Sequence, residues 1–151
     1  TGCMKLMMNG AVTIGTLDGA NVEMYERLGD ENMFLFGLHT DEIAQLRANG
    51  YDPGAIARND PEISRVFARF SEGFSDGKSY SDLVSQLLYG GDPYMLIADY
   101  RAYADCQKRL YERISDKGEL ARLAIMNTAE SGIFAADRAI SQYAHEIWNV
   151  K

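Results

Sequence analysis

Lys5 is the residue of this sequence whose surroundings point most directly to chemistry. It stands in an apolar run with Met4, Leu6, Met7 and Met8, and a glycine lies on either side of that run. Apolar surroundings disfavour a charged ammonium group and favour the neutral amine. The neutral amine is the form that condenses with the aldehyde of a cofactor. The run therefore predicts a lysine that anchors an aldehyde.

Thr1 and Gly2 precede this run, where a short helix is expected to begin. The free backbone N–H groups and the positive end of the dipole at a helix start can hold a phosphate. A lysine one helical turn from a phosphate-binding position suits pyridoxal phosphate. The alternative is structural: lysines in amphipathic helices commonly cover apolar surface with their stem while the amine reaches water.

A βαβ unit is predicted to follow the lysine. Residues 12–14 and 33–36 are brief apolar runs with β-branched or aromatic side chains, which indicates two short buried strands. Between them Asp18-Gly19 predicts a turn, and Asn21 is expected to cap a helix that ends at Leu28. Strand, helix and strand in this order predict a parallel pair. Ligands collect at the carboxyl ends of such strands, although the glycines here are equally consistent with tight turns alone.

The rest of the chain is predicted to be mainly helical. Residues 95–97 fit either a last strand or the entrance to a helix. Apolar stripes at helical spacing, with Pro and Gly as start and stop signals, predict helices over 41–48, from 53, from 61, and over 80–89, 99–115, 118–130 and 137–150. We therefore expect an α/β fold in a single 151-residue piece, with a βαβ segment at 1–37 and a mainly helical remainder at 38–151.

Several motifs of this chain occur together in one register. They are TG-x-MK at 1–5, NGA at 9–11, TIGTLDGANVE at 13–23, MFLFG at 33–37, ADY at 98–100, CQ at 106–107 and SQYAHEIW at 141–148. With these motifs the chain resembles the α-glucan phosphorylases, the family of glycogen, starch and maltodextrin phosphorylases, and its first segment resembles their cofactor-lysine region. The family usually has Asn where this chain has Cys3, so one polar group beside the cofactor differs.

This resemblance implies a fold, a reaction and a cofactor. Members of the family are several times longer and consist of two facing α/β domains of the Rossmann-like, GT-B type, and this chain would be a C-terminal fragment of the second. They cleave the terminal bond of an α-1,4-glucan with inorganic phosphate and release α-glucose 1-phosphate, using pyridoxal 5′-phosphate. Lys5 would bind the cofactor aldehyde, and Thr1 and Gly2 would hold its 5′-phosphate. Most residues that bind phosphate and sugar lie upstream in the family, so we expect the fragment alone to be inactive.

Two other functions stay open at this point. The chain could be a non-catalytic structural or interaction domain that retains the fold, a reading that its acidity and Cys3 permit. Such a domain has no reason to keep Lys5 among methionines. A different pyridoxal enzyme, such as a transaminase, would add a carboxylate at the pyridine nitrogen and an arginine for its substrate, and no motif for either stands out.

Charge and composition disfavour several partners. The formal net charge is −7 and the pI about 4.8, which disfavours binding to nucleic acids and to anionic membrane surfaces. No run approaches the roughly 18 apolar residues of a spanning helix. Cys3 and Cys106 suit a reducing, cytoplasmic compartment rather than a disulfide framework. Together with His39 and His145 they show no metal-binding spacing, so no metal is predicted.

The last predicted helix carries a broad apolar face. Ile140, Tyr143, Ile147 and Trp148 fall on one side of it. A small sheet cannot cover so many apolar helix faces, and an apolar patch left open usually finds a partner. We therefore expect self-association of the isolated chain.

Overall fold

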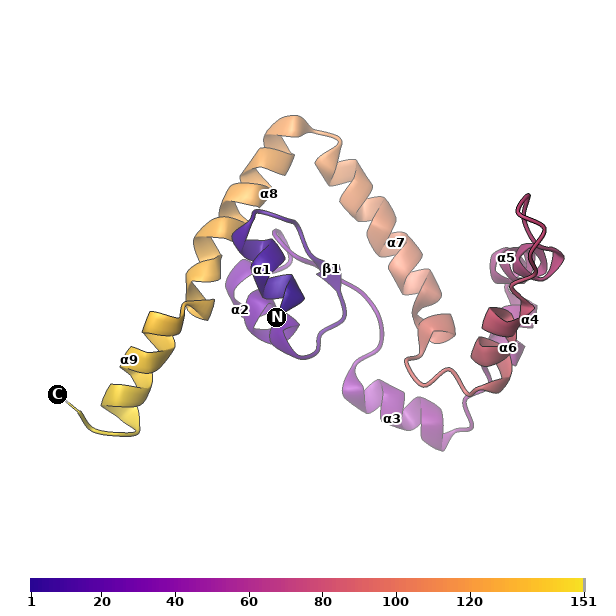
Figure 1. The fold of residues 1–151 in the computed structure, drawn as a ribbon, viewed down its shortest axis with the longest axis horizontal. Coiled ribbons are helices and arrows are strands. Elements are labelled where there is room, and N and C mark those ends of the chain that lie inside the picture. Colours follow the sequence, from indigo (N-terminus) through magenta and orange to yellow (C-terminus); the bar gives the residue numbers. More distant parts are fainter. Residues whose placement is uncertain (151) are drawn as a thin grey trace. The chain divides into compact units, whose positions relative to one another are not determined.

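A computed structural model describes residues 1–150 of the chain. The described residues are mostly helical, with a single two-stranded parallel sheet among them (Figure 1). They group into two compact units. The first unit combines Thr1–Phe36 with the chain from Ala104 onward, and the second is Gly37–Tyr103. Each unit is described by itself.

The first unit opens with a βαβ arrangement preceded by a short helix. Its elements are α1 (Gly2–Met8), β1 (Ile14–Gly15), α2 (Ala20–Leu28) and β2 (Phe34–Leu35). The strands pair in parallel, with Ile14 opposite Phe34. The Phe34 amide donates to the Thr13 carbonyl at 3.0 Å, and the Phe36 amide donates to the Gly15 carbonyl at 3.1 Å. The predicted parallel pair is confirmed, and both strands are shorter than predicted.

The predicted capping role of Asn21 is wrong. Helix α2 begins at Ala20, with Gly19 as its N-cap residue, so Asn21 lies inside the helix. Its side-chain amide donates instead to the Thr16 carbonyl at 2.9 Å. A Cβ atom at Gly15 would lie 2.9 Å from this amide nitrogen, so Gly15 leaves the space that Asn21 needs. Asn21 therefore closes the turn after β1 from within the helix.

The later part of the first unit is helical. Helix α7 (Leu96–Ile114) enters this unit at Ala104, and α8 (Lys117–Glu130), η1 (Ser131–Phe134) and α9 (Ala136–Glu146) follow. Helix α9 stops earlier than the predicted 137–150. The Asp116 carboxylate caps α8, accepting from the Gly118 and Glu119 amides at 2.7 and 3.2 Å.

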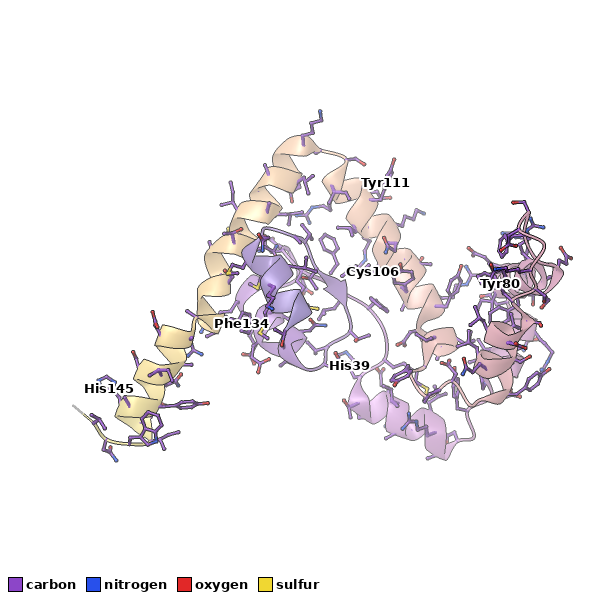
Figure 2. The ribbon with its side chains drawn as sticks, in the orientation of Figure 1. His39, Tyr80, Cys106, Tyr111, Phe134 and His145 are labelled. Atoms are coloured by element: carbon purple, nitrogen blue, oxygen red, sulfur yellow. The ribbon has the colours of Figure 1, made fainter. Side chains whose placement is uncertain are left out.

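Two apolar clusters form the core of this unit. The cluster beneath α1 contains Met7, Met24, Leu28 and Met33. The second cluster is centred on Phe34, Cys106 and Leu123, and it joins β2 to α7 and α8. The side chain of Cys106 is fully buried, and this burial raises the pKa of its thiol (Figure 2).

A polar network joins the two long helices to the segment before β2. Glu119 pairs with both Arg113 and Arg122, and hydrogen bonds from Arg122 and then Arg113 lower the pKa of the Glu119 carboxyl to about 2. Arg122 also donates to the Asn32 side-chain oxygen at 2.8 Å. The buried Asn127 amide donates to the Asn32 carbonyl at 3.2 Å. These bonds tie α8 to residues about 90 positions earlier in the chain.

The second unit contains four helices and the first part of α7. They are α3 (Thr40–Ala48), α4 (Pro53–Asn59), α5 (Pro61–Glu72) and α6 (Ser81–Tyr89). Ala57, Ile63 and Ile97 form its buried centre. Residues 95–97 are the entrance to α7 rather than a strand, because the Asp92 carboxylate accepts the Leu96 and Ile97 amides at 3.0 and 2.8 Å. No helix within residues 1–150 is long and apolar enough to cross a membrane.

Asp99, on the first turn of α7, is a charged group that the fold disfavours. It is 8% exposed and accepts the Leu38 amide at 2.9 Å. Burial first, and the nearby carboxylates of Asp92 and Glu42 second, raise the pKa of Asp99, while the Leu38 hydrogen bond lowers it. A carboxyl whose pKa is raised by folding binds its proton more readily in the folded protein. Ionised Asp99 therefore costs stability at neutral pH, and the cost fades as the pH falls.

We predict that Asp99→Asn raises the Tm at neutral pH by about 2–4 °C. The amide oxygen can still accept the Leu38 amide, and the buried charge is gone. The difference from the parent chain should shrink as the pH is lowered, as followed by circular dichroism during heating. Asp105→Asn, on an exposed position of the same helix, is the control and should leave the Tm unchanged. A lower Tm for Asp99→Asn, or a difference independent of pH, contradicts this account.

Candidate functional site

Helix α1 carries Lys5 and is held by three neighbouring elements. It contacts α2, α8 and η1. Figure 1 shows it in indigo beside α2 and α8. Two of the three supporting elements, α8 and η1, come from the last quarter of the chain. The position of the lysine is therefore set by residues far from it in sequence.

One face of α1 is buried through a single side chain. Met7 is fully buried and packs with Met24, Leu28 and Met33, and Phe134 of η1 lies against the same cluster (Figure 2). At most about 2–3 kcal/mol of hydrophobic free energy is gained by burying a side chain of this size. That gain is large for a helix of seven residues, which would not be stable alone.

The end of α1 is fixed by close contact with α8. Gly10 has a φ of 77°, which favours glycine, and its amide donates to the Met7 carbonyl at 2.9 Å. The Ala11 amide donates to the Leu6 carbonyl at 3.0 Å. A Cβ atom at Gly10 would lie 3.3 Å from the Cβ of Ala124, so a larger residue would push α1 away from α8. Glycine is needed here for both conformation and space.

The opposite side of α1 carries the predicted site residues. Side chains four positions apart share one face of a helix, so Thr1, Lys5 and Asn9 lie in one row. All three are exposed. The Asn9 side-chain amide donates to the Lys5 carbonyl at 2.7 Å, which completes the last turn. The structure therefore brings Thr1 and Lys5 together, one turn apart, on the open side of an anchored helix.

The predicted apolar surroundings of Lys5 are not found among the described residues. Lys5 is exposed, and Leu6 and Met8 beside it are each 58% exposed. The reason is the periodicity of the helix, which directs the consecutive apolar residues Leu6, Met7 and Met8 to different sides. Met7 faces the core, and its neighbours face outward. A run of apolar residues in one helix cannot enclose a lysine of that same helix.

The start of α1 is open. Thr1 is the N-cap residue, and its carbonyl accepts the Lys5 amide at 3.2 Å. Within the described residues its side chain makes no capping hydrogen bond. A Cβ atom at Gly2 would meet no atom within 4 Å. Phosphate binding by Thr1 and Gly2 stays a prediction, and the space around them is compatible with it.

The supporting residues on α8 were missed from the sequence. Gly10 ends the apolar run of α1, and its partner Ala124 lies in the separate helix predicted over 118–130. The one available signal was the pairing of a glycine with a small residue, and it says nothing about partners 114 positions apart.

In the part of the chain that the structure describes, no group of three or more His, Cys, Asp or Glu side chains could hold a metal ion.

Comparison with known proteins decides the family. The model of the carbohydrate phosphorylase family matches residues 1–150. The chain belongs to this family. A glycogen phosphorylase of Synechocystis is 46% identical over 154 residues, and the human muscle form of glycogen phosphorylase is 42% identical over 154 residues. A glycogen phosphorylase of Chlamydia pneumoniae is 41% identical over 153 residues. The predicted resemblance to the phosphorylases is confirmed.

This phosphorylase-family chain spans only part of its relatives. The alignments cover 99–100% of the chain but 18% of the length of each of these three proteins. Most of each relative therefore lies outside the region that this chain matches. The mostly helical structure with a small parallel sheet is consistent with an α/β phosphorylase fragment.

Substituting Met7 tests whether its burial holds the lysine helix. We predict that Met7→Ala lowers the free energy of unfolding of the first unit by about 2–4 kcal/mol, because it leaves a cavity among fully packed side chains. Met8→Ala is the matched control. It shortens the same type of side chain at the next position, where the side chain is 58% exposed, and should lower the free energy of unfolding by less than about 0.5 kcal/mol. Urea denaturation followed by circular dichroism measures both. Equal effects of the two substitutions would contradict the assignment of Met7 as the anchor.

Proposed function

We propose that this chain carries the cofactor lysine of an α-1,4-glucan phosphorylase. In the complete protein, inorganic phosphate would cleave terminal α-1,4-glucosidic bonds and release α-glucose 1-phosphate. Membership of the carbohydrate phosphorylase family and 41–46% identity to proteins named glycogen phosphorylase support this reaction. The structural observation that carries it is the placement of Lys5 on the open side of a helix anchored by Met7.

The proposed cofactor is pyridoxal 5′-phosphate. The amine of Lys5 would bind its aldehyde, and the Gly2 backbone and the Thr1 hydroxyl would hold its phosphate. The donor set fits: Thr1 and Lys5 share one exposed face, and the space around Gly2 is open. When bound, the cofactor supplies a phosphate that can relay a proton beside the substrate phosphate. The role of this chain is to bind and orient that group.

In the complete protein, further residues must cover the apolar side chains around Lys5. Leu6 and Met8 are exposed apolar side chains next to it, and covering them would exclude water from the lysine. We propose that this cover comes from the parts of the longer protein that lie outside the matched 18% of the relatives. The 151-residue chain would accordingly lack phosphorolysis on its own.

We further propose that residues 1–151 form the C-terminal part of one Rossmann-like, GT-B type catalytic domain, with the cofactor-lysine segment at 1–37 and a mainly helical remainder at 38–151. The parallel β1–α2–β2 arrangement supports this fold. A cytoplasmic location is supported by the free thiols of Cys3 and Cys106, both in the described residues. Self-association of the isolated chain is supported by the α9 region, where Tyr143 and Trp148 are 49% and 58% exposed.

Reductive labelling tests the cofactor assignment. The chain is incubated with pyridoxal phosphate and reduced with borohydride, and the modified residue is mapped by mass spectrometry. We predict dominant labelling of Lys5 over Lys78, Lys108, Lys117 and Lys151. Fragment ions of the N-terminal peptide separate label on Lys5 from label on the terminal amine. Inorganic phosphate should compete with the labelling of Lys5 if the helix start holds the cofactor phosphate.

Two controls make the result decisive. Pyridoxal, which lacks the phosphate, should label the five lysines alike, because only the phosphate confers preference for Lys5. Lys5→Arg should abolish the dominant product and leave the weak labelling of the other lysines unchanged. Even labelling of all lysines by pyridoxal phosphate would contradict the site. It would instead favour a non-catalytic domain that retains the fold.

A further inference from the structure

The end of α1 differs from the ends of most other helices in the described part of the chain. After α2, α3, α4, α5 and α6, the backbone amide of the first residue past the helix donates to the carbonyl four positions earlier. After α1 that residue is Asn9, and its amide donates instead to the Leu6 carbonyl, three positions earlier, at 3.0 Å. The carbonyl that loses its usual backbone donor is the carbonyl of Lys5.

The side chain of Asn9 replaces this donor. Its amide nitrogen Nδ2 donates to the Lys5 carbonyl oxygen at 2.7 Å. The next two backbone amides bond to later carbonyls of the helix, at 2.9 and 3.0 Å, which is a common way for a helix to end. The hydrogen bond to the Lys5 carbonyl therefore depends on the side chain at position 9.

This hydrogen bond fixes the direction in which the Lys5 side chain leaves the helix. The carbonyl lies directly after the Cα atom of Lys5, so holding it fixes the ψ angle of that residue. The Cα–Cβ bond of Lys5 is then held relative to the axis of α1, on the exposed face that Lys5 shares with Asn9. A carbonyl without a partner at a helix end would leave the last turn free to open.

Asn9 is itself held by the contact between α1 and α8 (Figure 1). The next residue, Gly10, lies against α8: a Cβ atom at Gly10 would be 3.3 Å from the Cβ of Ala124 and 3.4 Å from Oγ1 of Thr128. The contacts thus run from α8 through Gly10 and Asn9 to the Lys5 carbonyl. The packing that holds the end of the helix also holds the turn that carries Lys5.

We propose that Asn9 is a positioning residue for the lysine that binds the cofactor. It acts through the Lys5 carbonyl. By holding this turn, it reduces the conformational freedom that Lys5 gives up when its amine condenses with an aldehyde and water is released. The identity of the cofactor in this proposal rests on the proposed function, whereas the hydrogen bond does not. Asn9 itself needs no contact with the cofactor.

Ser115 offers a comparison within the same chain. It follows α7, and its hydroxyl donates to the carbonyl of Tyr111, four positions earlier, at 2.7 Å. The backbone amide of Ser115 donates to the same carbonyl at 3.1 Å, so this side chain duplicates a bond that the backbone already makes. The backbone amide of Asn9 donates elsewhere. A positioning role is therefore expected of the Asn9 side chain and not of the Ser115 side chain.

Competitive labelling tests this role. The 151-residue chain is labelled with limiting pyridoxal phosphate and borohydride, and the ratio of label on Lys5 to label on the exposed Lys108 is measured. We expect Asn9→Ala to lower this ratio by about three- to tenfold, the effect of losing one hydrogen bond. Asn9→Ser should recover most of the ratio, because a hydroxyl can reach the carbonyl four positions earlier, as Ser115 does. Ser115→Ala is the matched control and should leave the ratio unchanged.

A second measurement needs no cofactor. The backbone amide of Leu6 lies in the same peptide plane as the Lys5 carbonyl, so its NMR order parameter reports how firmly that plane is held. We expect a lower order parameter in Asn9→Ala than in the parent chain, and recovery in Asn9→Ser. Slow deuterium exchange of the Gly10 and Ala11 amides should persist in all variants, because α1 stays docked.

The outcomes separate this proposal from the cofactor assignment. The positioning role is overturned if Asn9→Ala keeps the labelling ratio of the parent chain, if Ser115→Ala lowers it equally, or if Asn9→Ser does not recover it. It is also overturned if Asn9→Ala undocks α1, since Asn9 would then only stabilise the helix. Even labelling of the parent chain contradicts the cofactor assignment instead. The order parameter of Leu6 then decides the positioning of Lys5, and an unchanged value in Asn9→Ala overturns it.

Discussion

The burial of Met7 is the contact on which the site depends. A helix of seven residues has too few internal hydrogen bonds to be stable alone, so α1 exists because tertiary packing holds it. Met7 supplies that packing from one face, and Gly10 allows the end of the helix to approach Ala124. Because this face is fixed against the core, Thr1 and Lys5 on the opposite face point outward. The reactivity proposed for Lys5 is thus set by a methionine two positions away and by a helix from the other end of the chain.

Other elements of the first unit, mainly the sheet with α7 and α8, support the packing of Met7. A two-stranded sheet is only marginally stable alone, and here helices cover it. The last carbonyl of β2, that of Leu35, accepts hydrogen bonds from Cys106 at 3.5 Å and from Arg109 at 3.1 Å, both on α7. Glu119 of α8 then ties the end of α7 to α8 through its ion pair with Arg113. Helices late in the sequence therefore hold the early βαβ segment in the conformation that places Lys5.

Local patterns predicted the local structure and missed what distant residues decide. Apolar runs and turn signals predicted α1, the parallel strands and most helices, because periodicity and capping act within a few residues. They assigned the wrong role to Asn21. An Asn side chain can cap a helix or can accept and donate in a neighbouring turn, and the sequence does not distinguish the two roles. Here Asn21 bonds to the turn after β1, because Gly15 leaves space for its side chain. They predicted an enclosed Lys5 from its sequence neighbours, whereas helical geometry leaves it exposed. The pairing of Asn32 with Asn127 and of Gly10 with Ala124 has no local signal. The assignment of the candidate site came from the resemblance of the motifs at 1–5, 9–11 and 13–23 to the phosphorylases, which periodicity alone could not provide.

Hydrogen–deuterium exchange of the 151-residue chain tests the central claim most directly. If Met7 and Gly10 dock α1 onto the later helices, the amides of Asn9, Gly10 and Ala11, which close the end of α1, will exchange slowly and together with those of α8. The exposed loop at residues 74–79 provides the fast reference within the same sample. Exchange of the α1 amides at the rate of this loop, while α2 and α8 stay protected, would show that the lysine helix is not held by the fold and would contradict the account.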